Sequence, residues 1–123
     1  VDRDGPEQLV LCFDDISVPM DGYVEPEEKH IHAALNFEHR LSKQTNGSIL
    51  IHCHAGISRS SALALAIIAK RLGQGKEKEA VRELEMINPN CRPNKSIVWM
   101  TDEILKRNRQ LYDTAYKMVW LTN

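Results

Sequence analysis

The sequence predicts an α/β protein with three layers, in which helices flank a mostly parallel central sheet. Two short segments with strand character, 8–13 and 48–51, are separated by a helical pattern. A strand, a helix and a second strand in this order form a right-handed crossover between parallel strands. The segment 61–69 that follows is apolar on all sides, which is typical of a helix in the interior of a fold.

The composition is ordinary for a globular protein, at 42% hydrophobic and 27% charged residues, and 123 residues suit a single domain over 1–123. A net charge of −1 gives no reason to expect nucleic acid or an acidic membrane as a partner. The longest apolar run, 62–69, is too short to span a bilayer. Because the chain opens on Val1 instead of Met, we expect that an N-terminal part precedes it.

An acidic loop is expected over 14–22, directly after the first strand, because Pro19 and Gly22 break regular structure. Loops that leave a strand at the carboxyl edge of an open α/β sheet carry the functional residues of such folds. The carboxylates of this loop are therefore candidate site residues.

A helix is predicted to begin near Glu25, since Pro26 and neighbouring acidic residues suit a helix N-terminus. Its apolar stripe starts at Ile31, but Glu38 occupies the position seven residues later. We therefore expect the buried stripe to lean towards Phe37 and Leu41.

Three helical segments follow the buried helix. The first, over about 76–87, has apolar residues at helical spacing, namely Ala80, Val81, Leu84 and Ile87. The second begins at a cap formed by Asn94 or Ser96 and is expected to place Asp102, Glu103 and Lys106 on a solvated face. The third lies within 109–123.

The most informative stretch joins the second strand to the buried helix and has the sequence His52-Cys53-His54-Ala55-Gly56-Ile57-Ser58-Arg59-Ser60. A strand, a tight turn and a helix N-terminus direct backbone N–H groups and the positive end of the helix dipole towards one point. An anion such as phosphate or sulfate binds at such a point. The backbone of residues 54–59 is expected to line it, and Gly56 lets an N–H group turn inward.

The side chains of this stretch suit phosphoryl transfer. Cys53 is the candidate nucleophile, because the same positive field favours its thiolate. Arg59 is placed to hold two phosphoryl oxygens and Ser60 to donate a hydrogen bond to the departing sulfur. His52 is expected to orient the turn or to tune the thiolate.

No metal or cofactor is expected. His30, His32, His39 and His54 are not spaced so that they share an ion, and Cys12, Cys53 and Cys91 lack the spacing of metal ligands. Cys12 and Cys91 are expected to be structural. A nucleophilic cysteine has to stay reduced, which favours a cytoplasmic protein.

The stretch resembles the His-Cys-x5-Arg-Ser/Thr signature of the cysteine-based protein tyrosine phosphatases, and its Ala-Gly-Ile-Ser-Arg-Ser form is most similar to the small dual-specificity branch. The resemblance covers roughly residues 8–105. It implies hydrolysis of phosphotyrosine, and also of phosphoserine or phosphothreonine, in a phosphorylated protein or peptide. The implied mechanism has two steps, in which Cys53 forms a phosphocysteine, Arg59 stabilises the transition state and Ser60 eases departure of the thiolate. Against this branch, one or two N-terminal strands are missing.

The resemblance also implies an aspartic acid that protonates the leaving group and then activates water. Two residues of the acidic loop compete for this role. Asp15 directly follows the first strand and is followed by Ile-Ser-Val-Pro, whereas Asp21 lies at the spacing usual in the small branch. We favour Asp15, because a position at the end of a strand sets the direction of the side chain, and Asp21 remains the alternative.

Two other hypotheses stay open. A phosphatase fold can bind phosphopeptides with little or no turnover, and rhodanese-like sulfurtransferases also carry a cysteine in a loop. The intact Cys53, Arg59 and Ser60 argue against the first, and the acidic loop together with Ser60 argues against the second.

Overall fold

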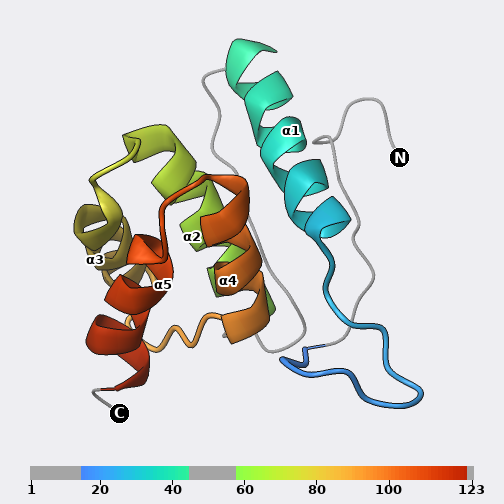
Figure 1. The fold of residues 1–123 in the computed structure, drawn as a ribbon. Coiled ribbons are helices and arrows are strands. Elements are labelled where there is room, and N and C mark those ends of the chain that lie inside the picture. Colours follow the sequence, from blue (N-terminus) through green and yellow to red (C-terminus); the bar gives the residue numbers. More distant parts are fainter. Residues whose placement is uncertain (1–14, 45–57, 122–123) are drawn as a thin grey trace.

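The computed structural model of the protein describes residues 15–44 and 58–121, and their regular structure is helical (Figure 1). The helices are α1 (Glu28–Gln44), α2 (Arg59–Leu72), α3 (Glu77–Ile87), α4 (Lys95–Ile104), α5 (Gln110–Ala115) and a π-helical segment, η1 (Tyr116–Trp120). No strand occurs within the described ranges, and both predicted strands, 8–13 and 48–51, lie outside them. The helical half of the predicted α/β fold is thus present.

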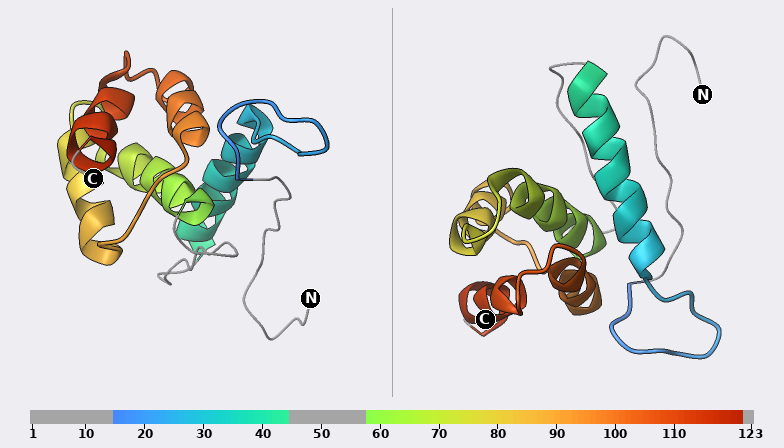
Figure 2. Two further views of the ribbon diagram at one scale, coloured as in Figure 1. Left: turned by 90° about the horizontal axis from the view of Figure 1, so that it is seen from below. Right: turned by 45° about the horizontal axis from the view of Figure 1, so that its top comes forward.

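Helix α2 lies at the centre of the helical layer, where α1, α3 and α4 pack against it (Figures 1 and 2). Helix α5 packs in turn against α3 and α4. The buried apolar residues of α2 are Ala62, Leu63, Leu65, Ala66, Ile67, Ile68 and Ala69. The prediction of an interior helix is confirmed. The N-terminus of this helix, at Arg59, belongs to the candidate site.

Glu38 is a buried carboxylate on the core-facing side of α1, with 4% of its surface exposed. Its Oε2 accepts a hydrogen bond from Nε of Arg71 on α2 (2.9 Å) and lies 2.8 Å from Nη2 of the same arginine. The prediction that the buried stripe leans towards Phe37 and Leu41 is wrong, because both are only half-buried. Glu38 keeps the core-facing position because Arg71 supplies the opposite charge.

Two side chains in the later helices also differ from prediction. Ile87, the last residue of α3, is 68% exposed, whereas the other apolar residues predicted for this helix are buried. Asp102 is buried, because its carboxylate accepts hydrogen bonds from the backbone N of Arg109 (2.7 Å) and of Tyr112 (3.0 Å). These donors belong to the first turn of α5 and the residue before it, so Asp102 supplies the cap that holds α5 against α4.

Asp102→Ala is expected to lower the free energy of unfolding by about 2 kcal/mol, because it leaves two partly buried N–H groups without their acceptor. Urea denaturation measures the change. Glu103→Ala is the matched control, since Glu103 is the exposed neighbour on the same helix and its loss is expected to cost less than about 0.5 kcal/mol. Equal losses for the two variants would contradict the capping role.

Arg107 is a buried cation between the end of α2 and the start of α3. Its Nη2 donates to the carbonyl of Ala69 (2.7 Å), and its Nη1 donates to the carbonyl of Gly73 (3.1 Å) and to Oε2 of Glu77 (2.6 Å). The same Glu77 oxygen accepts from the backbone N of Gly75 (3.1 Å). The side chains of Arg107 and Glu77 are 4% and 5% exposed, so this ion pair is shielded from water.

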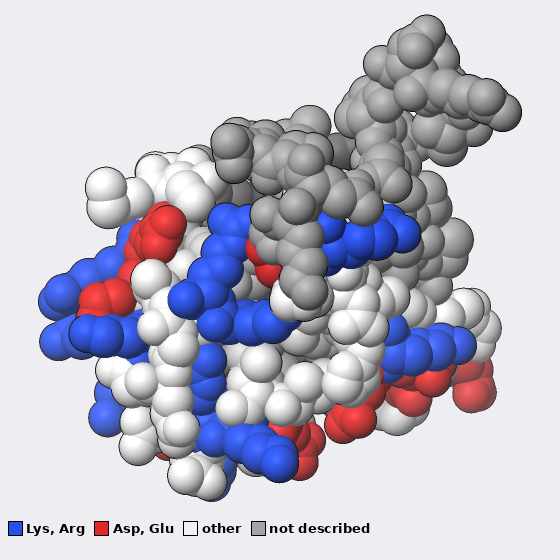
Figure 3. Space-filling view, turned by 90° about the horizontal axis from the view of Figure 1, so that it is seen from above, with Lys and Arg blue, Asp and Glu red and all other residues white. Residues whose placement is uncertain are grey.

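The charged side chains on the upper face of the molecule are mixed in sign. Lys and Arg side chains form several groups distributed over this face, and Asp and Glu side chains lie on its left and right sides (Figure 3). Within the ranges that the structure describes, no helix has the length and apolar character needed to cross a membrane.

Candidate active site

The described part of the site starts at the N-terminus of α2. Arg59 is the first residue of this helix and is partly buried, and Ser60 follows it with 6% of its surface exposed. The carbonyl of Ser58 accepts the first hydrogen bond of the helix, from the backbone N of Ala62 (3.0 Å). The rest of the predicted anion loop lies outside the described residues, namely His52, Cys53, His54, Ala55, Gly56 and Ile57.

Asp15 lies beside this helix N-terminus. Its Oδ1 accepts a hydrogen bond from Oγ of Ser58 (2.7 Å), a residue 43 positions later in the chain. The Ser58 side chain is therefore used for this contact and does not cap α2. A second bond to the same Asp15 oxygen comes from Nδ2 of Asn94 (2.8 Å). Both bonds hold Oδ1, and no described residue donates to Oδ2.

Asn94 connects three segments of the chain and is 4% exposed. Its Oδ1 caps α4 by accepting from the backbone N of Ile97 (3.0 Å), which confirms one of the two predicted caps. Besides its bond to Asp15, its Nδ2 donates to the carbonyl of Ile16 (3.0 Å), and its backbone N donates to the carbonyl of Ser58 (3.1 Å). The Asn94 side chain thereby ties the acidic loop to α4, and its backbone N ties the start of α2 to the same residue.

Sequence reasoning predicted Asn94 as a cap and missed this bridging contact. The residue lies 79 positions from Asp15, and nothing in its local pattern indicates a partner so far away. Ser58 was expected to contribute to the anion loop, and its bond to Asp15 was also not foreseen.

Asp21, the alternative acid, occupies a different setting. It lies in an exposed turn that is closed by the bond from the backbone N of Tyr23 to the carbonyl of Met20 (3.1 Å). Gly22 allows this turn, because its φ of 82° is unfavourable for other residues. No hydrogen bond or ion pair between described residues joins Asp21 to α2.

A hollow of about 500 Å³ opens between Asp15 and the segment that precedes α4. Its lining residues are Asp15, Ser17, Ser58, Arg92, Pro93, Asn94, Lys95 and Trp120. Asp15 is thus at the wall of a space that a bound molecule can enter, and two cations lie on the same wall.

Two other residues considered for chemistry, His30 and Cys91, occupy structural settings, while Cys12 lies outside the described residues. His30 stabilises the start of α1, where its Nδ1 accepts from the backbone N of Glu27 (2.9 Å). Burial raises the pKa of the Cys91 thiol, and the Glu85 carboxylate raises it further, which keeps this thiol protonated at neutral pH. Among the described residues, no three His, Cys, Asp or Glu side chains are grouped so that they could hold a metal ion.

Comparison with known families identifies the class of protein. Residues 10–103 match the model of the dual specificity phosphatase catalytic domain. This match covers most of the chain, including the acidic loop, the cysteine loop and the helices α1 to α3. The chain therefore belongs to the dual specificity phosphatase family.

Individual proteins similar to this chain are also named dual specificity protein phosphatases. Human (Homo sapiens) dual specificity protein phosphatase 15 is 28% identical over 75% of this chain and 31% of its own length. Human dual specificity protein phosphatase 16 is 43% identical over 43% of this chain and 8% of its own length. Bovine (Bos taurus) dual specificity protein phosphatase 26 is 49% identical over 32% of this chain and 18% of its own length. The matched regions therefore span less than a third of these relatives. No solved structure gives a significant match.

Proposed function

We propose that the chain is the catalytic domain of a phosphatase that removes phosphate from phosphotyrosine, and also from phosphoserine and phosphothreonine, in protein or peptide substrates. The observation that carries this proposal is the position of Asp15, which is held by Ser58 and Asn94 at the N-terminus of α2. A carboxylate at this place is next to the segment that contains Cys53 and Arg59, so an acid and a nucleophile can act on the same phosphate.

The proposed reaction has two steps. The Cys53 thiolate attacks phosphorus, the bond between phosphorus and the leaving oxygen breaks, and Asp15 gives its proton to that oxygen. A water molecule then attacks the phosphocysteine while Asp15 takes a proton from that water, so that inorganic phosphate and the Cys53 thiolate are released. Arg59 and the backbone of residues 54–59 bind the phosphoryl oxygens, and the Ser60 hydroxyl donates to the departing sulfur.

The contacts of Asp15 favour it over Asp21 as the acid. Two described donors, Ser58 and Asn94, fix Oδ1 of Asp15, and Asp15 lines the hollow that a substrate can enter. A general acid has to be positioned within hydrogen-bond reach of the atom that it protonates. Asp21 has no comparable support from described residues, and its turn is exposed.

The proposal extends to the organisation of the chain. Residues 1–123 belong to a single phosphatase domain, which we expect to include an N-terminal part before Val1, and we expect segments 8–13 and 48–51 to supply strands of the three-layer, mostly parallel sheet that the sequence predicts. The reaction needs no metal or cofactor, because a thiolate and a carboxylate supply the nucleophile and the proton. It also needs a reduced Cys53, which fits a cytoplasmic setting.

Asp15→Asn is expected to lower kcat for an alkyl phosphate or phosphotyrosine peptide by about 10²-fold, the usual contribution of a general acid. The amide oxygen still accepts from Ser58 and Asn94, so the variant removes the proton while the local geometry is kept. Steady-state hydrolysis measures the change. The loss in kcat/KM, which reports only the step that forms the phosphocysteine, should be much smaller for an aryl phosphate whose leaving group has a low pKa, because such a group departs without protonation.

Asp21→Asn is the matched control and is expected to retain kcat within about twofold, in line with a surface substitution. A large loss in Asp21→Asn with a normal Asp15→Asn enzyme would reassign the acid. A loss of kcat/KM in Asp15→Asn that is the same for every leaving group would indicate that Asp15 only supports the loop.

A further inference from the structure

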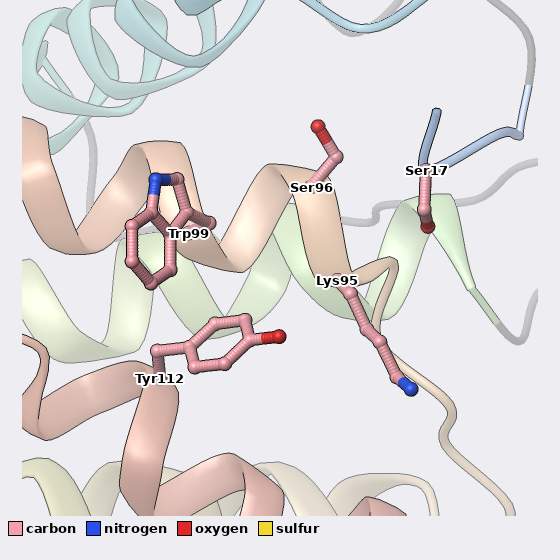
Figure 4. A pocket seen from close by; sticks show the side chains of 5 residues that line it. All are labelled: Ser17, Lys95, Ser96, Trp99 and Tyr112. Atoms are coloured by element: carbon pink, nitrogen blue, oxygen red, sulfur yellow. The ribbon is translucent and has the colours of Figure 1, made fainter. Parts of the chain in front are cut away.

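The hollow beside Asp15 continues along the start of α4 as one groove. A second hollow, of about 320 Å³, is lined by Ser17, Lys95, Ser96, Trp99 and Tyr112. Ser17 and Lys95 line both hollows, which therefore meet at these two residues. Figure 4 shows the Tyr112 hydroxyl pointing into the open space towards Lys95. The groove thus leads away from Asp15 along the start of α4.

Aromatic rings form one wall of this groove. The Tyr112 ring lies between those of Trp99 and Trp120, with 5.1 Å between ring centroids in each pair. The Trp120 indole is also tied to the segment before α4, since its Nε1 donates to the carbonyl of Pro93 (3.1 Å). Rings held in this way provide apolar contact area that is already ordered before a ligand arrives.

The charges along the groove are mainly positive. Arg92 and Lys95 line it, and the Lys95 Nζ lies 5.5 Å from the centre of the Trp120 ring. The Arg109 guanidinium lies over the Trp99 ring, with 5.4 Å between its Cζ and the ring centroid. Its Nη2 is also 3.6 Å from Oδ1 of Asp113. Among the described residues that line the two hollows, Asp15 is the only carboxylate, and Ser58 and Asn94 already hold one of its oxygens. The remainder of the groove therefore complements negative charge.

We propose that this groove binds an acidic peptide segment that flanks the phosphorylated residue of the substrate, an inference that rests on the proposed phosphatase function. Arg92 and Lys95 would pair with Glu or Asp side chains of the peptide, and the aromatic wall would contact the rest of the segment. Tyr112 and Trp120 lie after residue 103, where the match to the family ends.

Peptide affinity for the Cys53→Ser protein tests the groove without requiring turnover. Two matched phosphotyrosine peptides carry Glu or Gln at the positions on either side of the phosphotyrosine, and titration calorimetry gives each Kd. We expect the Glu peptide to bind about fivefold more tightly, as for a partly exposed charge pair, and we expect added salt to reduce this preference. A second substitution, Lys95→Gln, should lower the preference to about twofold or less.

Lys78→Gln is the matched control, because Lys78 is exposed on α3 and lines neither hollow. It should keep the full preference for the Glu peptide. Equal affinity for both peptides, or a preference that survives Lys95→Gln, would overturn the inference, as would the absence of measurable binding of either peptide. Hydrolysis of an aryl phosphate by the unmodified protein tests the proposed function separately. Phosphatase activity without a preference for the Glu peptide would contradict the groove inference and leave the proposed function intact.

Discussion

Cys53→Ser is expected to lower the turnover of an aryl phosphate by at least about 10³-fold, the scale on which loss of a catalytic nucleophile acts. In the proposed mechanism, the positive end of the α2 dipole and the Arg59 guanidinium favour the thiolate form of Cys53, the form that acts as a nucleophile. A serine hydroxyl ionises so much less readily that the same field leaves it protonated. The variant should still bind phosphate, because the backbone donors and Arg59 are kept.

Rapid acid quench of the unmodified enzyme with a radiolabelled substrate should trap phosphate on Cys53, and the label should be absent from Cys53→Ser. Cys91→Ser is the matched control, because Cys91 is a buried thiol whose burial raises its pKa, and kcat should stay within about twofold. Phosphopeptide binding without any trapped phosphocysteine would support a binding module instead. A persulfide on Cys53 in a protein without phosphatase activity would support sulfur transfer.

Arg107→Met is expected to lower the free energy of unfolding by about 3–5 kcal/mol, the cost typical of removing one partner of a buried ion pair. The change leaves the Glu77 carboxylate buried without its cation and removes one of the hydrogen-bond donors of the Ala69 and Gly73 carbonyls, each of which keeps a backbone donor. Because Arg107 joins the end of α2 to the start of α3, the whole helical layer should unfold at lower denaturant. Urea denaturation followed by circular dichroism measures the shift.

Arg109→Met provides the matched control, since Arg109 is 65% exposed and its 3.6 Å contact with Asp113 is a surface pair. Such a pair contributes about 0.5 kcal/mol or less. Adding Glu77→Gln to Arg107→Met should recover part of the lost stability, because the second change removes the unpaired charge. A loss for Arg107→Met no greater than that for Arg109→Met would show that the buried pair contributes little.

The carboxylates illustrate how far sequence reasoning could go. The apolar spacing predicted the helices and most of their inward faces correctly, because helical periodicity is local. It misplaced Glu38 and Asp102, which were expected to disturb the stripe or face solvent. Glu38 is buried by its contact with Arg71, which lies 33 positions away on another helix, and Asp102 by donors at the start of α5. A carboxylate is buried only where partners are supplied, and those partners are not visible in its own segment.

The family and the segment of the candidate site could be predicted from the amino-acid pattern, since His-Cys-x5-Arg-Ser between a predicted apolar strand and an apolar helix is specific in residue type and spacing. The match of residues 10–103 to the dual specificity phosphatase catalytic domain confirmed the family, while the catalytic roles of Cys53, Arg59 and Ser60 stay predictions. The acidic residue that meets the start of α2 could be identified only from the folded chain. Asp15 reaches Ser58 and Asn94 across 43 and 79 positions, because the acidic loop, α2 and α4 converge there. A hydrogen bond depends on distance and direction in space, and the chain pattern around Asp15 and Asp21 carries neither.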